Sequence, residues 1–232
     1  MAIKIEHKFI DRLFTEEDNI KIDILIIGTF NPGLPVFELL NETEKKQFDE
    51  IKSSKKFKSF CQIKNFYDRS QNRFWKVLDI LENPNIYKGD YEKINSNGLK
   101  FYTSKVKMDR DKTFERQIDY CRKKKIQITD LVRSIEPKSF CDIYDNFPDA
   151  IIEKSNPCWN TQHIKKMIYK YSPKKVLVNF DFECETTPNL NKQISELKTE
   201  FKTLEITRIL SPSGAAANSY HDLVQDWGRK IK

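Results

Sequence analysis

The sequence predicts an α/β fold: a three-layer sandwich in which a central, mostly parallel four-stranded sheet carries helices on both faces. Two observations predict it. Short apolar runs alternate with longer amphipathic stretches from residue 22 onward, and this order is typical of parallel strands that are joined by helices. The first run, residues 22–30, is mostly apolar on successive positions, as expected for a strand covered on both faces.

The patterns then place each element along the chain. Strands are expected at residues 22–30, 125–132, 174–180 and 204–210. Helices are expected at residues 72–83, 113–125, 161–171, 193–201 and 218–232. The basis for the helices is the recurrence of apolar residues at the spacing of one helix face. Because we find no internal repeat and no linker, residues 1–232 are expected to form a single domain.

Three polar stretches interrupt this pattern. Residues 36–65 begin with a helical pattern and then become rich in lysine, so we expect a surface insertion there. Residues 86–112 are expected to be irregular. Residues 133–160 contain three prolines and are expected to form a long loop with a short helix.

Composition and charge indicate the class of partner. The chain has 232 residues and a net charge of +7, which favours a polyanion such as nucleic acid, although lysine-rich soluble proteins share this property. The five cysteines include no C-x-x-C pair, so we expect no metal, no cofactor and no disulfide framework. No apolar run reaches the roughly 18 residues of a membrane span. We expect a cytoplasmic monomer without membrane association.

Two short motifs follow the first and last predicted strands. The sequence "GTFNPG" ends the first strand at Gly28–Gly33, and "SPSGAAAN" follows the last strand at residues 211–218. Carboxyl ends of parallel strands share one edge of the sheet, where ligands usually bind. Each motif alone is also compatible with an ordinary loop, in which Asn31 would bond to its own backbone.

A third motif makes the pattern specific. The sequence "FYDRSQNRFW" gathers four aromatic side chains, two arginines and two amides at the start of a predicted helix. Four short stretches, taken in order, resemble motifs of the uracil-DNA glycosylase superfamily, in its mismatch-specific uracil branch. They are "TFNPG", Tyr67 five residues before "NRFW", "ITDLV" and "SPSG". The pair Phe66–Tyr67 is similar to a tyrosine pair in the hypoxanthine-excising branch. The chain departs from the first motif at Thr29, where that branch has glycine.

The resemblance implies a DNA base glycosylase that flips a base out of the duplex and hydrolyses its N-glycosidic bond to leave an abasic site. It implies that Asn31 positions the attacking water. Since asparagine cannot ionise, the rate would come mainly from electrostatic stabilisation. Asn72 has three interpretations: a helix N-cap, a base contact or, as the resemblance to the hypoxanthine branch implies, the true catalytic residue.

Further site residues follow from the same resemblance. Tyr67 and Phe66 are expected to stack on the flipped base, in a base-binding pocket shared with Thr29 and Phe30. The expected DNA-binding residues are Gly33, Ser211, Ser213, Gly214 and Ala215. The sequence does not decide whether the excised base is uracil, hypoxanthine or a modified cytosine. It also leaves two roles, DNA repair and anti-phage defence. One alternative is a non-catalytic module that binds DNA or a modified base on the same fold. Another is an unrelated α/β nucleotide-binding protein.

Overall fold

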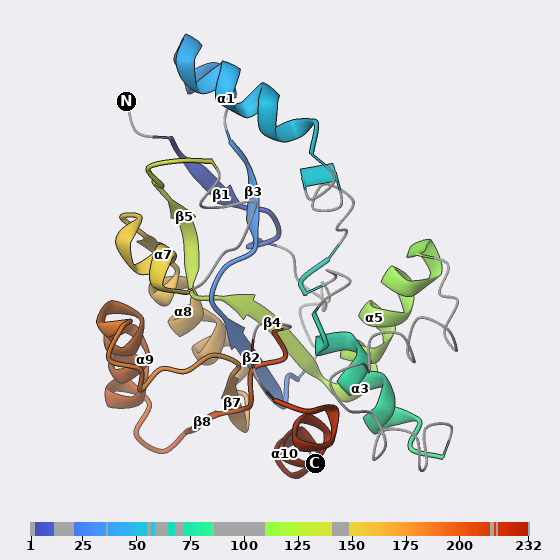
Figure 1. Ribbon diagram of the computed structural model, residues 1–232. Helices are drawn as coiled ribbons and strands as arrows, with labels where there is room; N and C mark the ends of the chain where they lie inside the picture. Colours follow the sequence, from blue (N-terminus) through green and yellow to red (C-terminus); the bar gives the residue numbers. More distant parts are fainter. Residues whose placement is uncertain are drawn as a thin grey trace.

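A parallel sheet lies at the centre of the molecule (Figure 1). The computed structural model describes residues 3–11, 21–35, 37–54, 57–58, 65–67, 72–85, 110–140, 149–213, 216 and 218–231. Within these ranges the sheet has four strands, which are β2 (Ile24–Gly28), β4 (Ile126–Asp130), β7 (Lys175–Val178) and β8 (Glu205–Arg208). Their order is β4-β2-β7-β8, and every neighbouring pair is parallel. The four predicted strands and their direction are confirmed.

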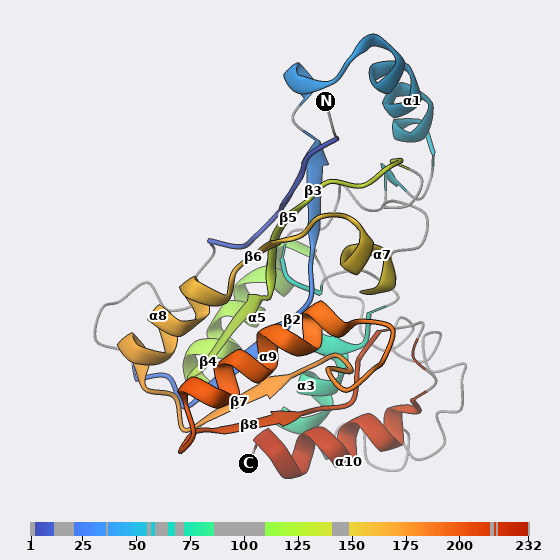
Figure 2. The ribbon, with the colours of Figure 1, turned by 90° about the vertical axis from the view of Figure 1, so that its left-hand side faces the viewer.

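Helices cover both faces of this sheet (Figures 1 and 2). One side carries α8 (Thr161–Tyr171) and α9 (Pro188–Glu200), and the other carries α3 (Phe74–Glu82), α5 (Arg110–Lys124) and α10 (Tyr220–Ile231). Each helix turns an apolar stripe inward. On α10, for example, Leu223 and Trp227 are fully buried, and the Trp227 ring meets the Phe74 ring edge to face. The predicted three-layer α/β sandwich is therefore confirmed.

A second, antiparallel sheet was not predicted. In the described part of the chain it contains β1 (Ile5–His7), β3 (Pro32–Pro35), β5 (Val132–Ile135) and β6 (Cys158–Trp159), in the order β3-β1-β5-β6. Strands of two to four residues are too short to give a clear alternating pattern. Residues 133–160, expected as a loop with a short helix, thus also contribute to two strands. The expected short helix is α7 (Asp149–Lys154).

Two chain segments pass from the parallel sheet into the antiparallel one. Strand β2 continues as β3 after residues 29–31, and β4 continues as β5 after Leu131. We call residues 29–31 and 131 the strand crossing. Backbone hydrogen bonds join its two segments, from Leu131 N to Gly28 O at 2.8 Å and from Val132 N to Thr29 O at 3.1 Å. The "TFNPG" motif therefore connects two strands and is not an ordinary loop.

The predicted insertion begins with a capped helix. Helix α1 (Glu42–Lys52) starts at Asn41, whose side chain accepts from Glu44 N while the Glu44 carboxylate accepts from Asn41 N. This capping box satisfies two backbone donors of the first turn. Phe48 is the buried residue of α1, and the helix lies at the end of the molecule far from the parallel sheet (Figure 1). Of the stretch 86–112 that was expected to be irregular, residues 86–109 lie outside the described residues, and residues 110–112 belong instead to the first turn of α5.

Candidate functional site

Asp130 forms the centre of a polar cluster at the strand crossing. It is the last residue of β4, and its side chain has no exposed surface. Described residues donate three hydrogen bonds to its carboxylate, from His7 Nε2 at 2.7 Å, from Asn31 Nδ2 at 2.5 Å and from the Tyr67 hydroxyl at 2.5 Å. All three partners donate, which suits an ionised carboxylate. Residues far apart in sequence thus meet at the carboxyl edge of the parallel sheet.

His7 has a defined tautomer in this cluster. Its Nδ1 accepts a hydrogen bond from the backbone N–H of Phe9 at 2.9 Å, so Nδ1 carries no proton. The ring proton of neutral His7 therefore lies on Nε2 and points to Asp130. The ring is enclosed by Phe30 and Phe66, with centroids 5.5 and 5.4 Å away. His7 was not predicted as a site residue.

The Asn31 side chain is held in one orientation. Because a carboxylate only accepts hydrogen bonds, the NH2 group of Asn31 must face Asp130, and the carbonyl oxygen Oδ1 points away from it. The Asn31 backbone is also fixed, since its carbonyl accepts from Lys8 N at 2.8 Å. The partner of the Asn31 amide is therefore 99 residues away. This corrects the ordinary-loop interpretation, in which Asn31 bonds to its own backbone.

Tyr67 adopts a backbone conformation that is uncommon for a residue with a side chain, with φ at 56°. Its ring stacks on Phe74 at 4.5 Å between centroids. Burial first, and then the Asp130 charge, raise the pKa of its hydroxyl well above the usual value. A Cβ at Gly28 would lie 1.6 Å from this hydroxyl oxygen and 2.5 Å from Asp130 Oδ1. Glycine at position 28 is thus required for Tyr67 to reach Asp130.

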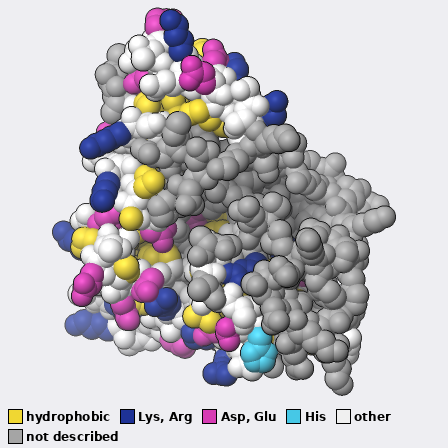
Figure 3. Space-filling model, in the orientation of Figure 1, with side chains coloured by type: hydrophobic (Ala, Val, Ile, Leu, Met, Phe, Trp, Pro, Cys, Tyr) yellow, Lys and Arg dark blue, Asp and Glu magenta, His cyan; other side chains and the backbone are white. Residues whose placement is uncertain are grey.

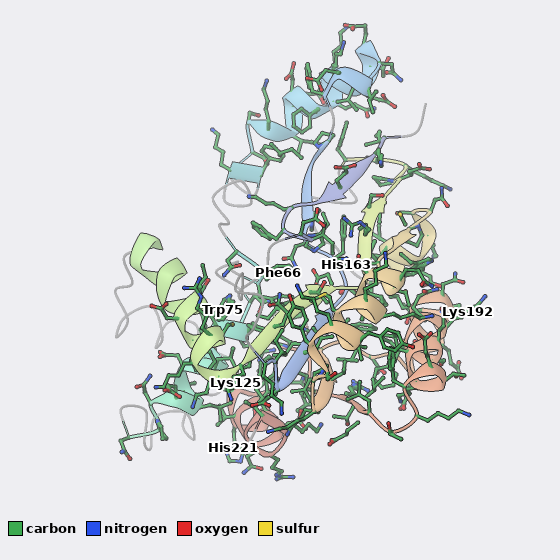
Figure 4. All side chains as sticks on the ribbon, turned by 180° about the vertical axis from the view of Figure 1, so that it is seen from behind. Phe66, Trp75, Lys125, His163, Lys192 and His221 are labelled. Carbon is green, nitrogen blue, oxygen red and sulfur yellow. The ribbon has the colours of Figure 1, made fainter. Side chains whose placement is uncertain are left out.

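Phe66 and Phe30, which were predicted to contact the base, are buried in the core. Phe66 has no exposed surface and Phe30 is 8% exposed. Phe66 packs between His7 and Phe9, and its carbonyl accepts a hydrogen bond from Trp75 Nε1 at 2.6 Å. Figure 4 shows Phe66 in the interior. The sequence predicts that both rings contact a base, whereas here core packing accounts for their positions.

A second carboxylate, Asp149, lies next to the cluster. It is the first residue of α7, and the Thr29 side chain hydrogen-bonds to it. Burial first, and then the Asp130 charge, raise the pKa of Asp149, while the Thr29 hydrogen bond lowers it. Thr29 was predicted at this site, but Asp149 was not, because it lies in the stretch expected to be a loop.

Asn179 follows β7 on the same edge and was also missed. It is buried, and it lies close enough to the Tyr67 hydroxyl to lower the pKa of that group. Its amide nitrogen nevertheless makes no well-aligned hydrogen bond with any described residue. A buried donor without a partner carries an energetic cost, which a ligand with an acceptor atom would remove.

The side chains of Asn72 and Arg73 hydrogen-bond to backbone groups and not to the Asp130 cluster. Asn72 Oδ1 accepts from Phe74 N at 2.8 Å, but the N-cap residue of α3 is Arg73, whose side chain makes no capping hydrogen bond. The Arg73 guanidinium donates to Ser213 O at 2.6 Å, Ala216 O at 3.1 Å, Pro212 O at 3.4 Å and Asn218 O. Arg73 therefore holds the loop at residues 211–218, which we call the SPSG loop.

The predicted DNA-binding residues that the structure describes lie in two places, the SPSG loop and β3. Ser211 and Ser213 are half-buried in the SPSG loop, and Ser211 O accepts from Asn218 Nδ2 at 3.1 Å. Gly214 and Ala215 lie outside the described residues. Gly33 lies in β3, where a Cβ would be 2.7 Å from Glu6 O of β1. Close approach of two strands thus explains Gly33, in place of the predicted DNA contact.

Two lysines that precede strands of the parallel sheet lie away from this site. Lys125 precedes β4 and Lys174 precedes β7, so both stand at the amino edge of the sheet, and both pair with Asp23, at 3.9 and 3.1 Å. Figure 4 shows Lys125 near the start of β4 and Phe66 near its other end. On the face seen in Figure 3, the described Lys and Arg side chains are interspersed with Asp and Glu.

No protein-family model matches this chain, and no curated protein matches it. Among the helices that the structure describes, none is long and apolar enough to cross a membrane. The described side chains also include no group of three or more His, Cys, Asp or Glu residues arranged to hold a metal ion.

Proposed function

We propose that this protein is a monofunctional DNA glycosylase, which flips a damaged, deaminated or modified base and hydrolyses its N-glycosidic bond. The observation that carries the proposal is the oriented side chain of Asn31. Asp130 holds its amide nitrogen at 2.5 Å, so the carbonyl oxygen is available to accept a hydrogen bond from water. A rigid, correctly oriented group of this kind avoids reorganisation during the reaction.

The charges of the cluster suit the proposed reaction. As the bond from the base to C1′ breaks, the sugar gains positive charge and the base leaves with the electron pair. Asp130 and Asp149 place carboxylates at the strand crossing, where they favour a developing cation in a site screened from water. Asn179 offers a buried amide donor to an acceptor atom of the leaving base. Uracil, hypoxanthine and a modified cytosine all carry such an atom.

We assign DNA binding to the SPSG loop. Arg73 donates to backbone carbonyls of this loop and so fixes the backbone that carries Ser211 and Ser213, which we propose contact phosphates. Phosphate contacts position a protein on DNA without reading sequence. The net charge of +7 supports the same partner. We propose that the protein acts on DNA as a monomer, in repair or in defence against phage with modified DNA.

The test is an excision assay on duplexes that each carry one uracil, hypoxanthine or modified cytosine. We expect strand breaks at the lesion only after alkali treatment, because a monofunctional enzyme leaves an intact backbone at the abasic site. Binding is measured in parallel, and log K should fall by about 0.9 per phosphate contact for each unit of log salt. Salt-sensitive binding without any excision would support the alternative of a binding module. The absence of both would contradict a nucleic-acid partner.

A further inference from the structure

The N-terminal strand brings a histidine to the candidate site. Strand β1 pairs with β3 on one side and with β5 on the other, so it lies between the two strands that continue from the strand crossing. His7 is the last residue of β1, and the backbone N–H of the next residue, Lys8, donates to Asn31 O at 2.8 Å. The end of β1 is therefore attached directly to the residue that we propose orients the water.

The His7 ring is fixed by hydrogen bonds at both nitrogens. Nδ1 accepts from Phe9 N at 2.9 Å, and Nε2 donates to Asp130 Oδ2 at 2.7 Å. The side chain has no exposed surface, and the rings of Phe30 and Phe66 enclose it, with centroids 5.5 and 5.4 Å away. Because both nitrogens are engaged, the Nε2–H group keeps one direction, and it points at the Asp130 carboxylate.

His7 and Asn31 donate to the same oxygen of Asp130. Both bonds end on Oδ2, at 2.7 Å from His7 Nε2 and at 2.5 Å from Asn31 Nδ2, whereas Tyr67 binds Oδ1. The position of Oδ2 therefore depends on His7 as well as on Asn31. Without the His7 donor, Oδ2 would be free to move with the Asn31 amide, and the carbonyl oxygen of Asn31 would lose its fixed direction.

Core packing alone does not require a histidine at position 7. A phenylalanine ring would suit the apolar enclosure formed by Phe30 and Phe66, but it offers neither an acceptor for Phe9 N nor a donor for Asp130. Histidine supplies both on one ring. Supporting hydrogen bonds of this kind keep a catalytic side chain within the narrow range of geometry that its reaction needs.

We propose that His7 is a positioning residue, which holds Asp130 Oδ2 and through it directs the Asn31 carbonyl oxygen at the attacking water. This inference rests on the proposed glycosylase function. In this role His7 touches no reacting atom and exchanges no proton. Its loss should therefore slow the chemical step and leave the affinity for lesion DNA unchanged, because contacts with phosphates supply most of that affinity.

The experiment compares His7→Phe and His7→Gln in single-turnover excision, with binding to lesion DNA measured alongside. Phenylalanine keeps a ring in the enclosure without the donor, whereas the glutamine amide nitrogen takes the place of Nε2 and restores a donor. We expect His7→Phe to be about tenfold slower or more, since a displacement of roughly 1 Å can cost about a hundredfold. His7→Gln should recover most of the rate, and both variants should bind as the wild type does.

The matched controls are the same two substitutions at His163, a half-buried residue of α8, and they should leave the rate unchanged. A merely structural role of His7 would not be rescued by glutamine. The inference is overturned if His7→Phe excises at the wild-type rate, or if His7→Gln is as slow as His7→Phe. Either result leaves the proposed function standing, because the wild type still excises.

A double-mutant cycle with Asn31→Ala shows whether His7 acts through Asn31. In the Asn31→Ala background no amide remains to be directed, so His7→Phe should cause no further loss of rate. An equal loss in both backgrounds would show that His7 affects the reaction by another route, and the inference would be wrong.

A measurement on the wild type covers the case in which the His7 variants fail to fold, and it needs no activity. The chain has three histidines, so nitrogen NMR can identify the protonated ring nitrogen of His7. We expect the proton on Nε2, and slow hydrogen exchange of the Asn31 NH2 group, because both groups face the buried Asp130 carboxylate. A proton on Nδ1, or rapid exchange of the Asn31 NH2 group, would overturn the inference. If the wild type excises no base at all, the proposed function fails, and the role of His7 fails with it.

Discussion

The Asn31 amide donates to Asp130 Oδ2 at 2.5 Å, and this hydrogen bond joins residues that are 99 positions apart. The bond connects the strand crossing to the end of β4 and gives the Asn31 carbonyl oxygen a fixed direction. His7 and Tyr67 donate to the same carboxylate. Asp130 is thus the residue on which the geometry of the candidate site depends.

Asp130→Asn should destabilise the fold. One oxygen of the carboxylate becomes an NH2 group, which places a donor among the three donors that now face Asp130. An unsatisfied buried donor costs about 1–3 kcal/mol, so we expect the free energy of unfolding to fall by that amount in urea titrations. The control is Asp181→Asn, which breaks an exposed ion pair with Arg208 at 2.9 Å and should cost about 1 kcal/mol or less. Equal effects of the two substitutions would contradict the central role of Asp130.

Gly28→Ala should displace Tyr67. The new Cβ would lie 1.6 Å from the Tyr67 hydroxyl oxygen, and inserting an atom into a packed site costs about 1–3 kcal/mol. Gly228→Ala on α10 is the matched control, since its Cβ would meet Leu81 Cδ2 at 3.2 Å, at the end of a flexible side chain. There the gain in helix propensity, about 1 kcal/mol, offsets the tight contact. Thermal unfolding of both variants checks this difference, and an unchanged melting temperature for Gly28→Ala would refute the packing described for Tyr67.

Arg73→Lys should loosen the SPSG loop. A guanidinium presents its donors in a planar fork, whereas an ammonium is a compact point charge, so lysine cannot reach the carbonyls of Pro212, Ser213 and Ala216 together. We expect faster hydrogen exchange in residues 211–218 and weaker duplex binding. Arg229→Lys, at an exposed position on α10, should change neither property. Unaltered exchange in the loop would show that Arg73 does not hold it.

Asp149→Asn should stabilise the fold near neutral pH. The pKa of Asp149 is raised above its usual 3.8, so the folded state binds more protons than the unfolded state between these two values. Stability therefore falls as the pH rises through this window, and removing the carboxylate removes that loss. Asp222→Asn should have the opposite sign, because Ser219 lowers the pKa of Asp222, although this exposed group has the smaller effect. Urea titrations at pH 4 and pH 7 compare the two, and a less stable Asp149→Asn variant at pH 7 would refute the buried environment.

The parallel sheet was predictable because burial on both faces imposes continuous apolar runs. The strand Ile24–Gly28 has no exposed residue, and its neighbours β4 and β7 have nearly the same character. The antiparallel sheet was harder to predict because its strands are short. One signal was nevertheless present: Ile3, Ile5, His7 and Phe9 are buried while Lys4 and Glu6 are exposed, so the period of a half-buried strand would have placed His7 on the inner face.

The site was predictable only in part. Asn31 and Tyr67 belong to motifs that the sequence analysis identified, and both hydrogen-bond to the Asp130 carboxylate. This agrees with the expectation that the site lies at the carboxyl edge of the sheet. Asp130 could have been found, since an acidic residue at the end of an apolar strand is costly to bury without a partner. Asp149 gave no comparable signal, because its contact with Thr29 depends on how α7 packs against the strand crossing.

The most direct test of the account compares single-turnover excision by Asn31→Ala and Asn72→Ala on the best substrate duplex. Asn31→Ala should lose about two orders of magnitude or more in rate, comparable to roughly 3 kcal/mol for one preorganised polar group, while it still binds lesion DNA. Asn72→Ala should lose less, because the Asn72 oxygen already accepts a hydrogen bond from Phe74 N at the start of α3. If Asn31→Ala keeps a near-normal rate and Asn72→Ala is inactive, the catalytic assignment of Asn31 is wrong.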